Sequence, residues 1–295
     1  MDVVTAVKGR APRWAKDTAN RATRNFGVAT AAFRPPPDFL IIGTKRGGTT
    51  SLWNYLLGHP HVLPMFPAPR GLKSPYYFFE HLDRGERWYR SHFPTSAARE
   101  LAARRLGGPV VTGEASPYYL YYPQAPGLVR ASLPEVKLVV LLRDPVKRAY
   151  SHYWERVGQG VEPLGFAEAL AAEPARLRGE LERVFAEPGY YSRAHDYFAY
   201  RDRGVYLPQL ERWFAQYPRD RALVLRSEDL YRDEQATVDQ VCDFLGIPRR
   251  RVPTRIRHNY IPAPPMDPAV RDELRSFYQP HNAALARFLD MDLGW

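Results

Sequence analysis

The stretch GTKRGGTTS, residues 43–51, combines glycine, basic and hydroxyl residues in a pattern typical of an anion-binding loop. Glycines let the backbone approach an anion closely, and the basic and hydroxyl side chains add charge and hydrogen bonds to its oxygens. An anion with several oxygens, such as a phosphate group, is therefore the expected ligand. The candidate binding residues are Lys45, Arg46, Gly47, Gly48, Thr49, Thr50 and Ser51.

The segments on either side of this loop predict a strand before it and a helix after it. Phe39 to Ile42 form a short apolar run typical of a strand buried on both faces, and Gly43 ends the run. From Thr49 to Leu57 the apolar side chains fall on one helical face. We therefore expect the loop at the amino end of a helix, where free N–H groups and the helix dipole favour an anion.

The same loop nearly matches the phosphate loop of nucleoside triphosphatases, GxxxxGK[ST]. Gly43 to Thr50 follow that spacing except at the lysine, where Thr49 stands. Because the lysine of those enzymes reaches the terminal phosphates, its absence argues against hydrolysis of a nucleoside triphosphate. A small-molecule kinase that uses ATP and magnesium remains an alternative function, and so does an inactive nucleotide-binding scaffold.

A second group of candidate residues follows VKLVVLL, residues 136–142, which predict a strand at the centre of a parallel sheet. Arg143 would lie at the carboxyl end of this strand, where ligands bind in open α/β sheets. Asp144 and Pro145 predict the start of a helix, and Ser151 comes about two turns after Arg143, on the same side. We expect a second phosphate here, and the two sites together indicate an adenine nucleotide phosphorylated at both ends.

The length and composition favour a single α/β domain with a mainly parallel sheet. The chain has 295 residues, of which 45% are hydrophobic, enough for one large core. Helices are expected at residues 86–106 and 124–132, and strands at 109–113 and 221–225. Cys242 is the single cysteine and is expected in the core, so a disulfide within the chain and a cysteine zinc site are excluded.

The charge balance suits an anionic partner. Forty-two Lys and Arg residues against 32 Asp and Glu residues give a net charge of +10. The sequence has no zinc spacing, RNA-binding signature or dense basic helix, so nucleic acid is not the expected partner. No long apolar run predicts a membrane-spanning helix or a secretory signal, and we therefore expect a cytoplasmic protein.

The first 37 residues predict a basic extension that precedes a domain at residues 38–295. Seven Lys or Arg and two acidic residues occur in the first 34 positions, and Pro35, Pro36 and Pro37 form a stiff spacer. A solvated, loosely ordered extension is the simpler interpretation. Peripheral contact with an anionic membrane surface is the alternative.

Three stretches together resemble the sulfotransferases, nearest the carbohydrate and heparan-sulfate type and their bacterial relatives. They are GTKRGGTTS after one strand, LLRDPVKRAYS after another, and RSFYQPHNAALARFLDMDLGW at the carboxyl end, and the resemblance covers residues 38–295. It implies a P-loop-like fold of three layers around a mainly parallel sheet. It also implies in-line transfer of a sulfuryl group from 3′-phosphoadenosine 5′-phosphosulfate, without a metal, to a hydroxyl or amine of a carbohydrate, glycolipid or small-molecule acceptor.

The resemblance also implies how the donor is held. The loop from Lys45 to Ser51 would bind the 5′-phosphosulfate, and Arg143 with Ser151 would bind the 3′-phosphate. In the family a basic loop closes over the 3′-phosphate, and here RRRVPTRIRHNY, residues 249–260, lies at that place. Its candidate binding residues are Arg255, Arg257 and Asn259.

One departure from the family concerns the cation at the leaving group. The family usually has a lysine two residues before the second glycine of the loop, and Arg46 stands there, with Lys45 beside it. Either cation can neutralise charge that develops on the bridging oxygen, although arginine does not donate a proton. Both Lys45 and Arg46 are therefore candidate catalytic residues.

The other departure concerns the general base. Heparan-type enzymes have a glutamate in a segment that resembles KExHFF, whereas this chain reads LKSPYYFFE, with Ser74 near the expected position. Glu114, after the strand at 109–113, and Glu80 are the candidate bases, with His61 and His152 behind them. Salt bridges to neighbouring arginines are the alternative role for the two glutamates. Residues 59–80 are expected to form one wall of the cleft, and residues 158–201 a substrate-side insertion.

Overall fold

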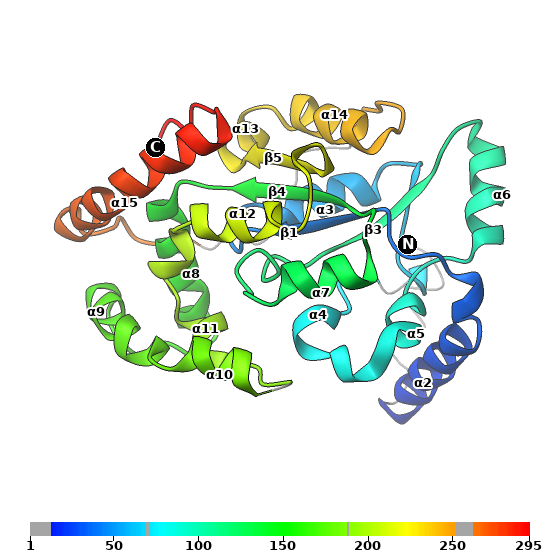
Figure 1. Ribbon diagram of the computed structural model, residues 1–295, viewed down its shortest axis with the longest axis horizontal. Coiled ribbons are helices and arrows are strands. Elements are labelled where there is room, and N and C mark those ends of the chain that lie inside the picture. Colours follow the sequence, from blue (N-terminus) through cyan, green and yellow to red (C-terminus); the bar gives the residue numbers. More distant parts are fainter. Residues whose placement is uncertain (1–12, 69–70, 188, 252–261) are drawn as a thin grey trace.

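The computed structural model describes residues 13–68, 71–187, 189–251 and 262–295. At its centre lies a five-stranded, all-parallel sheet with the strand order β2-β3-β1-β4-β5 (Figure 1). The strands are β1 (Phe39–Gly43), β2 (Val62–Leu63), β3 (Val111–Ala115), β4 (Lys137–Leu142) and β5 (Ala222–Arg226). The middle strand β1 is buried along its whole length, as expected for a parallel sheet covered on both faces.

Helices cover the sheet on both sides and give the three predicted layers. In Figure 1, α7 and α12 lie in front of the sheet and α3 behind it. A second apolar cluster, which includes Ala149, Leu170 and Leu274, joins α8, α9 and α15 beside the sheet. The helices are α2 (Arg13–Ala29), α3 (Thr49–Leu57), α4 (Tyr77–Glu80), α5 (Gly85–Arg90), α6 (Ser96–Leu106), α7 (Ala125–Ser132), α8 (Pro145–Gly158), α9 (Phe166–Leu177), α10 (Glu180–Ala186), α11 (Arg193–Tyr197), α12 (Leu207–Phe214), α13 (Ser227–Arg232), α14 (Glu234–Leu245) and α15 (Pro268–Leu289).

The predicted strands and the two helices that flank the binding loops are confirmed to within one or two residues. The single helix expected over residues 86–106 is wrong, because the structure has two helices there, α5 and α6. Pro94 has no N–H to continue a helix, and the Thr95 hydroxyl accepts a hydrogen bond from the Ala98 N–H at 3.2 Å, which starts α6. Cys242 is fully buried, as expected.

The basic extension contains an element that the sequence analysis did not predict. Helix α2 lies against α5 (Figure 1), and Arg24 Nη1 donates to Ser91 Oγ at 2.8 Å. Arg34 is buried, donates to the Phe93 carbonyl at 2.5 Å and lies over the Phe66 ring. Residues 20–37 therefore pack on the sheet-containing part of the chain. A domain boundary after residue 37, a membrane contact and a cytoplasmic location stay predictions.

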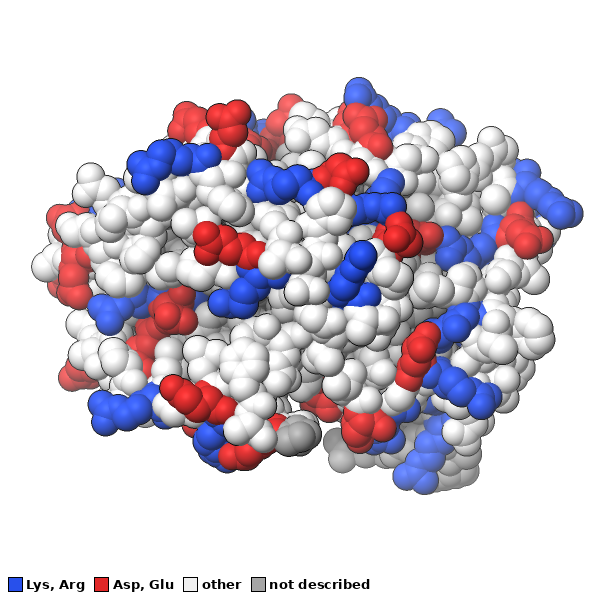
Figure 2. Space-filling model, in the orientation of Figure 1, with Lys and Arg blue, Asp and Glu red and all other residues white. Residues whose placement is uncertain are grey.

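The surface charges are mixed on the face shown in Figure 2, where basic and acidic side chains alternate. The net charge of +10 is therefore not gathered into one patch on that face. Over the described residues, no helix combines the length and apolarity that a membrane span requires.

Candidate active site

Three strands bring the predicted binding residues to one edge of the sheet. Because β1, β3 and β4 are parallel and neighbouring, their carboxyl ends lie together, and ligands bind at such an edge. The loop of residues 44–48 leaves β1 there, Ser116 follows β3, and Arg143 follows β4. The sheet thus joins two binding segments that lie about a hundred residues apart in the sequence.

The two glycines of the loop are required by close packing. A Cβ atom at Gly47 would lie 2.9 Å from the carbonyl oxygen of Leu141, and one at Gly48 would lie 2.9 Å from the Tyr231 hydroxyl. Gly48 also has a φ of 87°, in the left-handed region that favours glycine. The Ser227 hydroxyl donates to the carbonyl of Gly47. The loop therefore lies directly against the ends of β4 and β5.

The amino end of α3 collects hydroxyl groups and a cation that comes from another segment. Lys73 Nζ donates to Thr49 Oγ1 at 3.2 Å and to Thr50 Oγ1 at 2.9 Å. Position 49 lacks the lysine of nucleoside triphosphatases, and Lys73 instead places an ammonium group beside the hydroxyl of Thr49. Ser51 Oγ, in the same turn, is buried without a hydrogen-bond partner among the described residues.

The second predicted group lies beside the loop, as expected. Arg143 Nη1 donates to the carbonyl oxygen of Arg46 at 2.8 Å, and Arg46 Nε donates to Ser151 Oγ at 3.0 Å. Tyr206 donates to the Arg143 carbonyl at 2.8 Å and fixes the turn after β4. The Asp144 carboxylate accepts from the N–H groups at the start of α8, which confirms the predicted cap.

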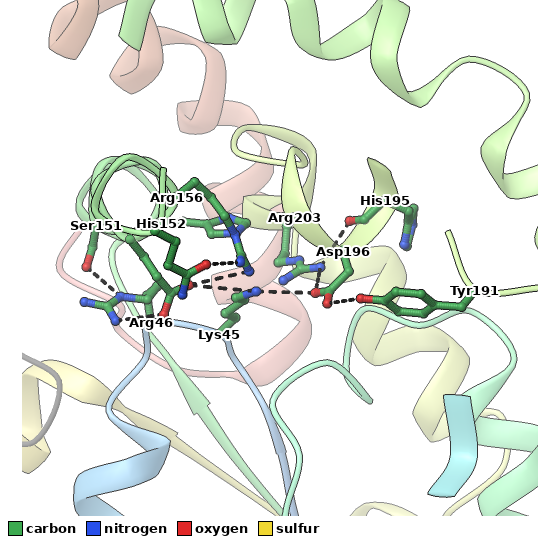
Figure 3. Close-up of polar contacts among 11 residues, drawn as sticks. Lys45, Arg46, Ser151, His152, Arg156, Tyr191, His195, Asp196 and Arg203 are labelled. Atoms are coloured by element: carbon green, nitrogen blue, oxygen red, sulfur yellow. Dashed lines mark hydrogen bonds and ion pairs between the residues drawn. The ribbon is translucent and has the colours of Figure 1, made fainter. Parts of the chain in front are cut away.

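The loop cations are paired with carboxylates from α8 and α11. Lys45 Nζ lies 3.4 Å from Asp196 Oδ1 and 3.8 Å from Glu155 Oε2, and Arg46 Nη1 lies 3.1 Å from Glu155 Oε1. Arg203 Nη2 contacts the same Asp196 oxygen at 3.1 Å. Figure 3 shows Lys45 and Arg203 meeting at Asp196, while Arg46 reaches toward Ser151. The insertion that carries Asp196 is thereby tied to the loop.

Burial changes the pKa values of these groups. Loss of water lowers the pKa of Lys45 to about 8, against the opposing field of Asp196, and it lowers the pKa of Lys73 to about 8. Burial alone would raise the pKa of Asp196, but the charges of Lys45 and Arg203 outweigh it and hold that pKa well below its ordinary value. The two lysines can therefore change protonation near neutral pH, while Asp196 remains ionised.

A cavity of about 910 Å³ opens at this edge of the sheet and is large enough for a nucleotide and a second molecule. The segment at residues 59–80 contributes to its wall, as the sequence predicted, and residues of the insertion at 158–201 line it as well. Of the predicted site residues, the cavity is lined by Lys45, Arg46, Gly48, Thr49, Thr50, Glu80, Arg143 and Ser151. Arg255, Arg257 and Asn259 lie outside the described residues.

The structure separates the candidate bases. Glu80 is exposed at the end of α4 and lines the cavity. Glu114 is fully buried and does not line it. His61 contacts the carbonyl oxygen of Pro109 at 2.7 Å, away from the cavity, and His152 is fully buried, where burial holds its pKa well below the ordinary value. Direct contact with an acceptor is thus open only to Glu80.

Glu114 instead supports the cavity from behind. Its carboxylate accepts hydrogen bonds from Ser74 at 2.7 Å, Tyr89 at 2.9 Å and Tyr119 at 3.3 Å. Burial raises its pKa to about 7, although these three hydrogen bonds act in the opposite direction. Its enclosure gives Glu114 a positioning role toward the segment that carries Ser74 and Lys73.

The sequence analysis missed six charged residues that line the cavity: Lys73, Lys147, Glu155, Asp196, Arg271 and Arg275. The sequence does contain a pattern that points to Lys73, because this residue begins the stretch KSPYYFF, which resembles the family's KExHFF segment. The pattern that points to Glu155 is weaker: this residue follows Ser151 by four positions and so shares its helix face. Asp196 lies in the segment interpreted as a substrate-side insertion, and no local pattern links it to a loop residue 151 positions away.

These residues fit a nucleotide phosphorylated at both ends. One group of hydrogen-bond donors consists of the loop, Lys73 and the amino end of α3. Arg143 and Ser151 form the other group. Ser51 Oγ lies in the same turn of α3 but does not line the cavity, so its lack of a hydrogen-bond partner among the described residues is no sign of the ligand.

Comparisons with known proteins agree with this site. The chain is 28% identical to heparan sulfate glucosamine 3-O-sulfotransferase 6 of Mus musculus over 292 residues, which cover 88% of this chain and 73% of that protein. It is 26% identical to the bifunctional heparan sulfate N-deacetylase/N-sulfotransferase 3 of Homo sapiens over 94% of this chain. This chain covers only 32% of that longer protein.

A solved structure shares the fold. The sulfotransferase from Alicyclobacillus acidocaldarius superposes with a TM-score of 0.65 at 29% identity, over 88% of this chain and 98% of that one. The profile of the Sulfotransferase family matches residues 37–251, which include both binding segments and the insertion. Because this match spans well over half of the sequence, the chain belongs to the sulfotransferase family.

Proposed function

We propose that this sulfotransferase takes its sulfuryl group from 3′-phosphoadenosine 5′-phosphosulfate and passes it to a hydroxyl, or an amine, of an acceptor in the same cavity. The observation that carries the proposal is that two clusters of cationic and hydroxyl side chains lie at one edge of the sheet. Lys45, Arg46 and Lys73 surround the amino end of α3. Arg46 links Arg143 to Ser151, because its carbonyl accepts from Arg143 and its side chain donates to Ser151.

The two groups suit the two ends of the donor. The N–H groups of the first turn of α3, with Lys45 and Lys73, would hold the 5′-phosphosulfate. Arg143 and Ser151 would hold the 3′-phosphate, as arginine and hydroxyl groups do at phosphate sites. When bound, the donor supplies a sulfuryl group and a phosphate that gains negative charge as that group leaves.

The chain's own residues would stabilise that charge in fixed positions. Lys45 and Lys73 are held by carboxylate or hydroxyl partners, so they need little reorganisation, and such preorganised charge commonly provides the largest part of catalysis. A pKa of about 8 lets either lysine donate a proton near neutral pH, which Arg46 does not do. We assign Glu80 as the base that takes the acceptor proton, because it is the candidate glutamate that lines the cavity.

This proposal is preferred over the kinase alternative. Family membership favours sulfuryl transfer, and the chain places Thr49 where a kinase loop would have its lysine. A glycan or small-molecule acceptor is supported by relatives named for heparan sulfate. The absence of a metal from the reaction remains part of the proposal.

The test is transfer of labelled sulfur from the phosphosulfate donor. We expect purified protein to release 3′-phosphoadenosine 5′-phosphate only when an acceptor is present, with an equal amount of label on the acceptor. Donor binding without any transfer to a broad acceptor panel would instead favour the inactive scaffold. Transfer of a phosphoryl group from ATP would favour the kinase.

A further inference from the structure

We propose that the acceptor is an uncharged molecule that offers its hydroxyl from a ring with a flat, weakly polar face, and that polyanionic glycans are poor acceptors. The inference rests on the proposed function and names its substrate class. It is carried by an aromatic wall, defined as Tyr76, Phe79, Tyr118 and Tyr191, and by the charges around that wall.

The aromatic wall is continuous and lines the cavity. The Phe79 ring centroid lies 5.7 Å from that of Tyr76, 4.9 Å from that of Tyr118 and 5.9 Å from that of Tyr191. Tyr76 is 44% exposed, Phe79 and Tyr191 are half-buried, and Tyr118 is buried. Ring faces of this kind bind phenols and the C–H faces of sugars by stacking.

The wall leads directly to the proposed transfer site. Tyr191 donates from its hydroxyl to Asp196 Oδ2 at 2.6 Å, and Asp196 Oδ1 lies 3.4 Å from Lys45 Nζ. A ring stacked on the wall therefore lies next to the loop cation that would stabilise the leaving phosphate. Glu80, the proposed base, follows the wall residue Phe79 in the sequence and also lines the cavity.

The charges near the wall disfavour an anionic acceptor. Seven Lys or Arg and four Asp or Glu side chains line the cavity, a net charge of +3. The donor carries about four negative charges, from a phosphate monoester and a phosphosulfate, so the loaded cavity holds no excess positive charge within the described residues. Glu80 borders the wall, and its negative charge opposes a sulfated or carboxylated chain, whereas the charge of Asp196 is paired with Lys45 and Arg203.

Three further lining cations come from helices that do not carry the wall residues. Lys147 is on α8, and Arg271 and Arg275 are on α15, which packs against α8. Lys147 shares α8 with Ser151, which would bind the nucleotide. Two of the relatives are named for heparan sulfate, a polyanionic glycan. The proposed acceptor of this chain therefore differs from theirs in charge.

The test compares three acceptors with the same full-length protein and labelled donor at about 50 mM salt, where electrostatic effects are large. The probes are 2-naphthol, octyl glucoside and an N-sulfated heparosan oligosaccharide. Before the assay, stabilisation by 3′-phosphoadenosine 5′-phosphate is measured, because its absence would refute the proposed donor together with this inference. We expect kcat/KM for one of the uncharged probes to exceed that for the oligosaccharide by at least about tenfold, which corresponds to about 1.4 kcal/mol.

Stabilisation by the bisphosphate followed by equal or better transfer to the oligosaccharide would overturn the acceptor inference alone. If no probe is turned over, equilibrium binding to the bisphosphate-loaded protein decides, and failure of both uncharged probes to bind also overturns it. Transfer to naphthol alone assigns a phenol, and transfer to the glucoside alone assigns a sugar.

A pair of variants ties the result to the wall. Phe79→Leu keeps an apolar side chain but removes the ring, so we expect the KM for the uncharged acceptor to rise at least about fivefold with the donor KM unchanged. The matched control is Phe185→Leu on α10, an exposed ring that does not line the cavity. Equal effects of the two substitutions would contradict the role of the wall.

Discussion

Replacing Glu114 with glutamine should change how the stability of the protein depends on pH. The carboxyl group is fully enclosed, and burial raises its pKa from 4.5 to about 7. An acid with a raised pKa holds its proton more tightly in the folded state. Its folded state is therefore favoured most below the unfolded pKa and loses stability as pH rises toward the folded pKa.

The size of the effect follows from the shift. A difference of two to three pKa units corresponds to about 3 kcal/mol, lost as pH rises from about 4.5 to somewhat above 7. Glutamine has no such titration. We therefore expect Glu114→Gln to be equal to or less stable than the parent at about pH 5, and to gain about 3 kcal/mol relative to the parent by about pH 8.

Urea denaturation at several pH values between these limits, for both proteins, measures the change in free energy of unfolding directly. Parallel curves for the two proteins would refute the reasoning. Turnover in the same samples tests the assigned role: a residue that only supports Ser74 should leave kcat within about tenfold. A loss of about a hundredfold or more would make Glu114 the base after all.

Three further substitutions test the site. Glu80→Gln should lower kcat about a hundredfold with donor affinity unchanged, and normal turnover would remove Glu80 as the base. Lys73→Ala should weaken bisphosphate binding about tenfold in a calorimetric titration, through loss of a charge beside Thr49 and Thr50, and unchanged binding would place Lys73 outside the donor site. Asp196→Asn removes a charge that raises the pKa of Lys45, so the alkaline limb of the kcat profile should move to lower pH. An unmoved limb would show that Lys45 is not the titrating group.

The elements that hold the donor site could be predicted because their signals are local. The apolar runs of β1 and β4, and the glycines and the cap residues after them, each identify their structure within a few neighbouring residues. The position of Arg143 beside the loop then follows from the general geometry of parallel sheets.

The acceptor side could not be predicted in the same way, because it depends on packing between distant segments. Asp196 meets Lys45 only through the folding of the insertion against α8. The exposure of Glu80 and the enclosure of Glu114 also depend on tertiary structure, since both glutamates end apolar stretches in the sequence. Charge and residue type alone therefore could not decide which of the two glutamates is the general base.

The packing of residues 20–37 was missed for a related reason. Basic composition indicates a solvated segment, yet Arg34 is buried against the Phe66 ring and the Phe93 carbonyl. Long basic side chains can bury their stems and keep hydrogen bonds for the charged group, which composition does not reveal.

The central claim, a donor site for a nucleotide phosphorylated at both ends, is tested most directly by thermal unfolding with 3′-phosphoadenosine 5′-phosphate beside ATP with magnesium. At about a hundred times its dissociation constant, the bisphosphate should add roughly 2.7 kcal/mol and raise the Tm by a few degrees. We predict that the shift occurs with the bisphosphate, is largely lost in Arg143→Ala, and does not occur with ATP. A shift with ATP and magnesium alone, or one that Arg143→Ala leaves intact, would contradict the assigned site.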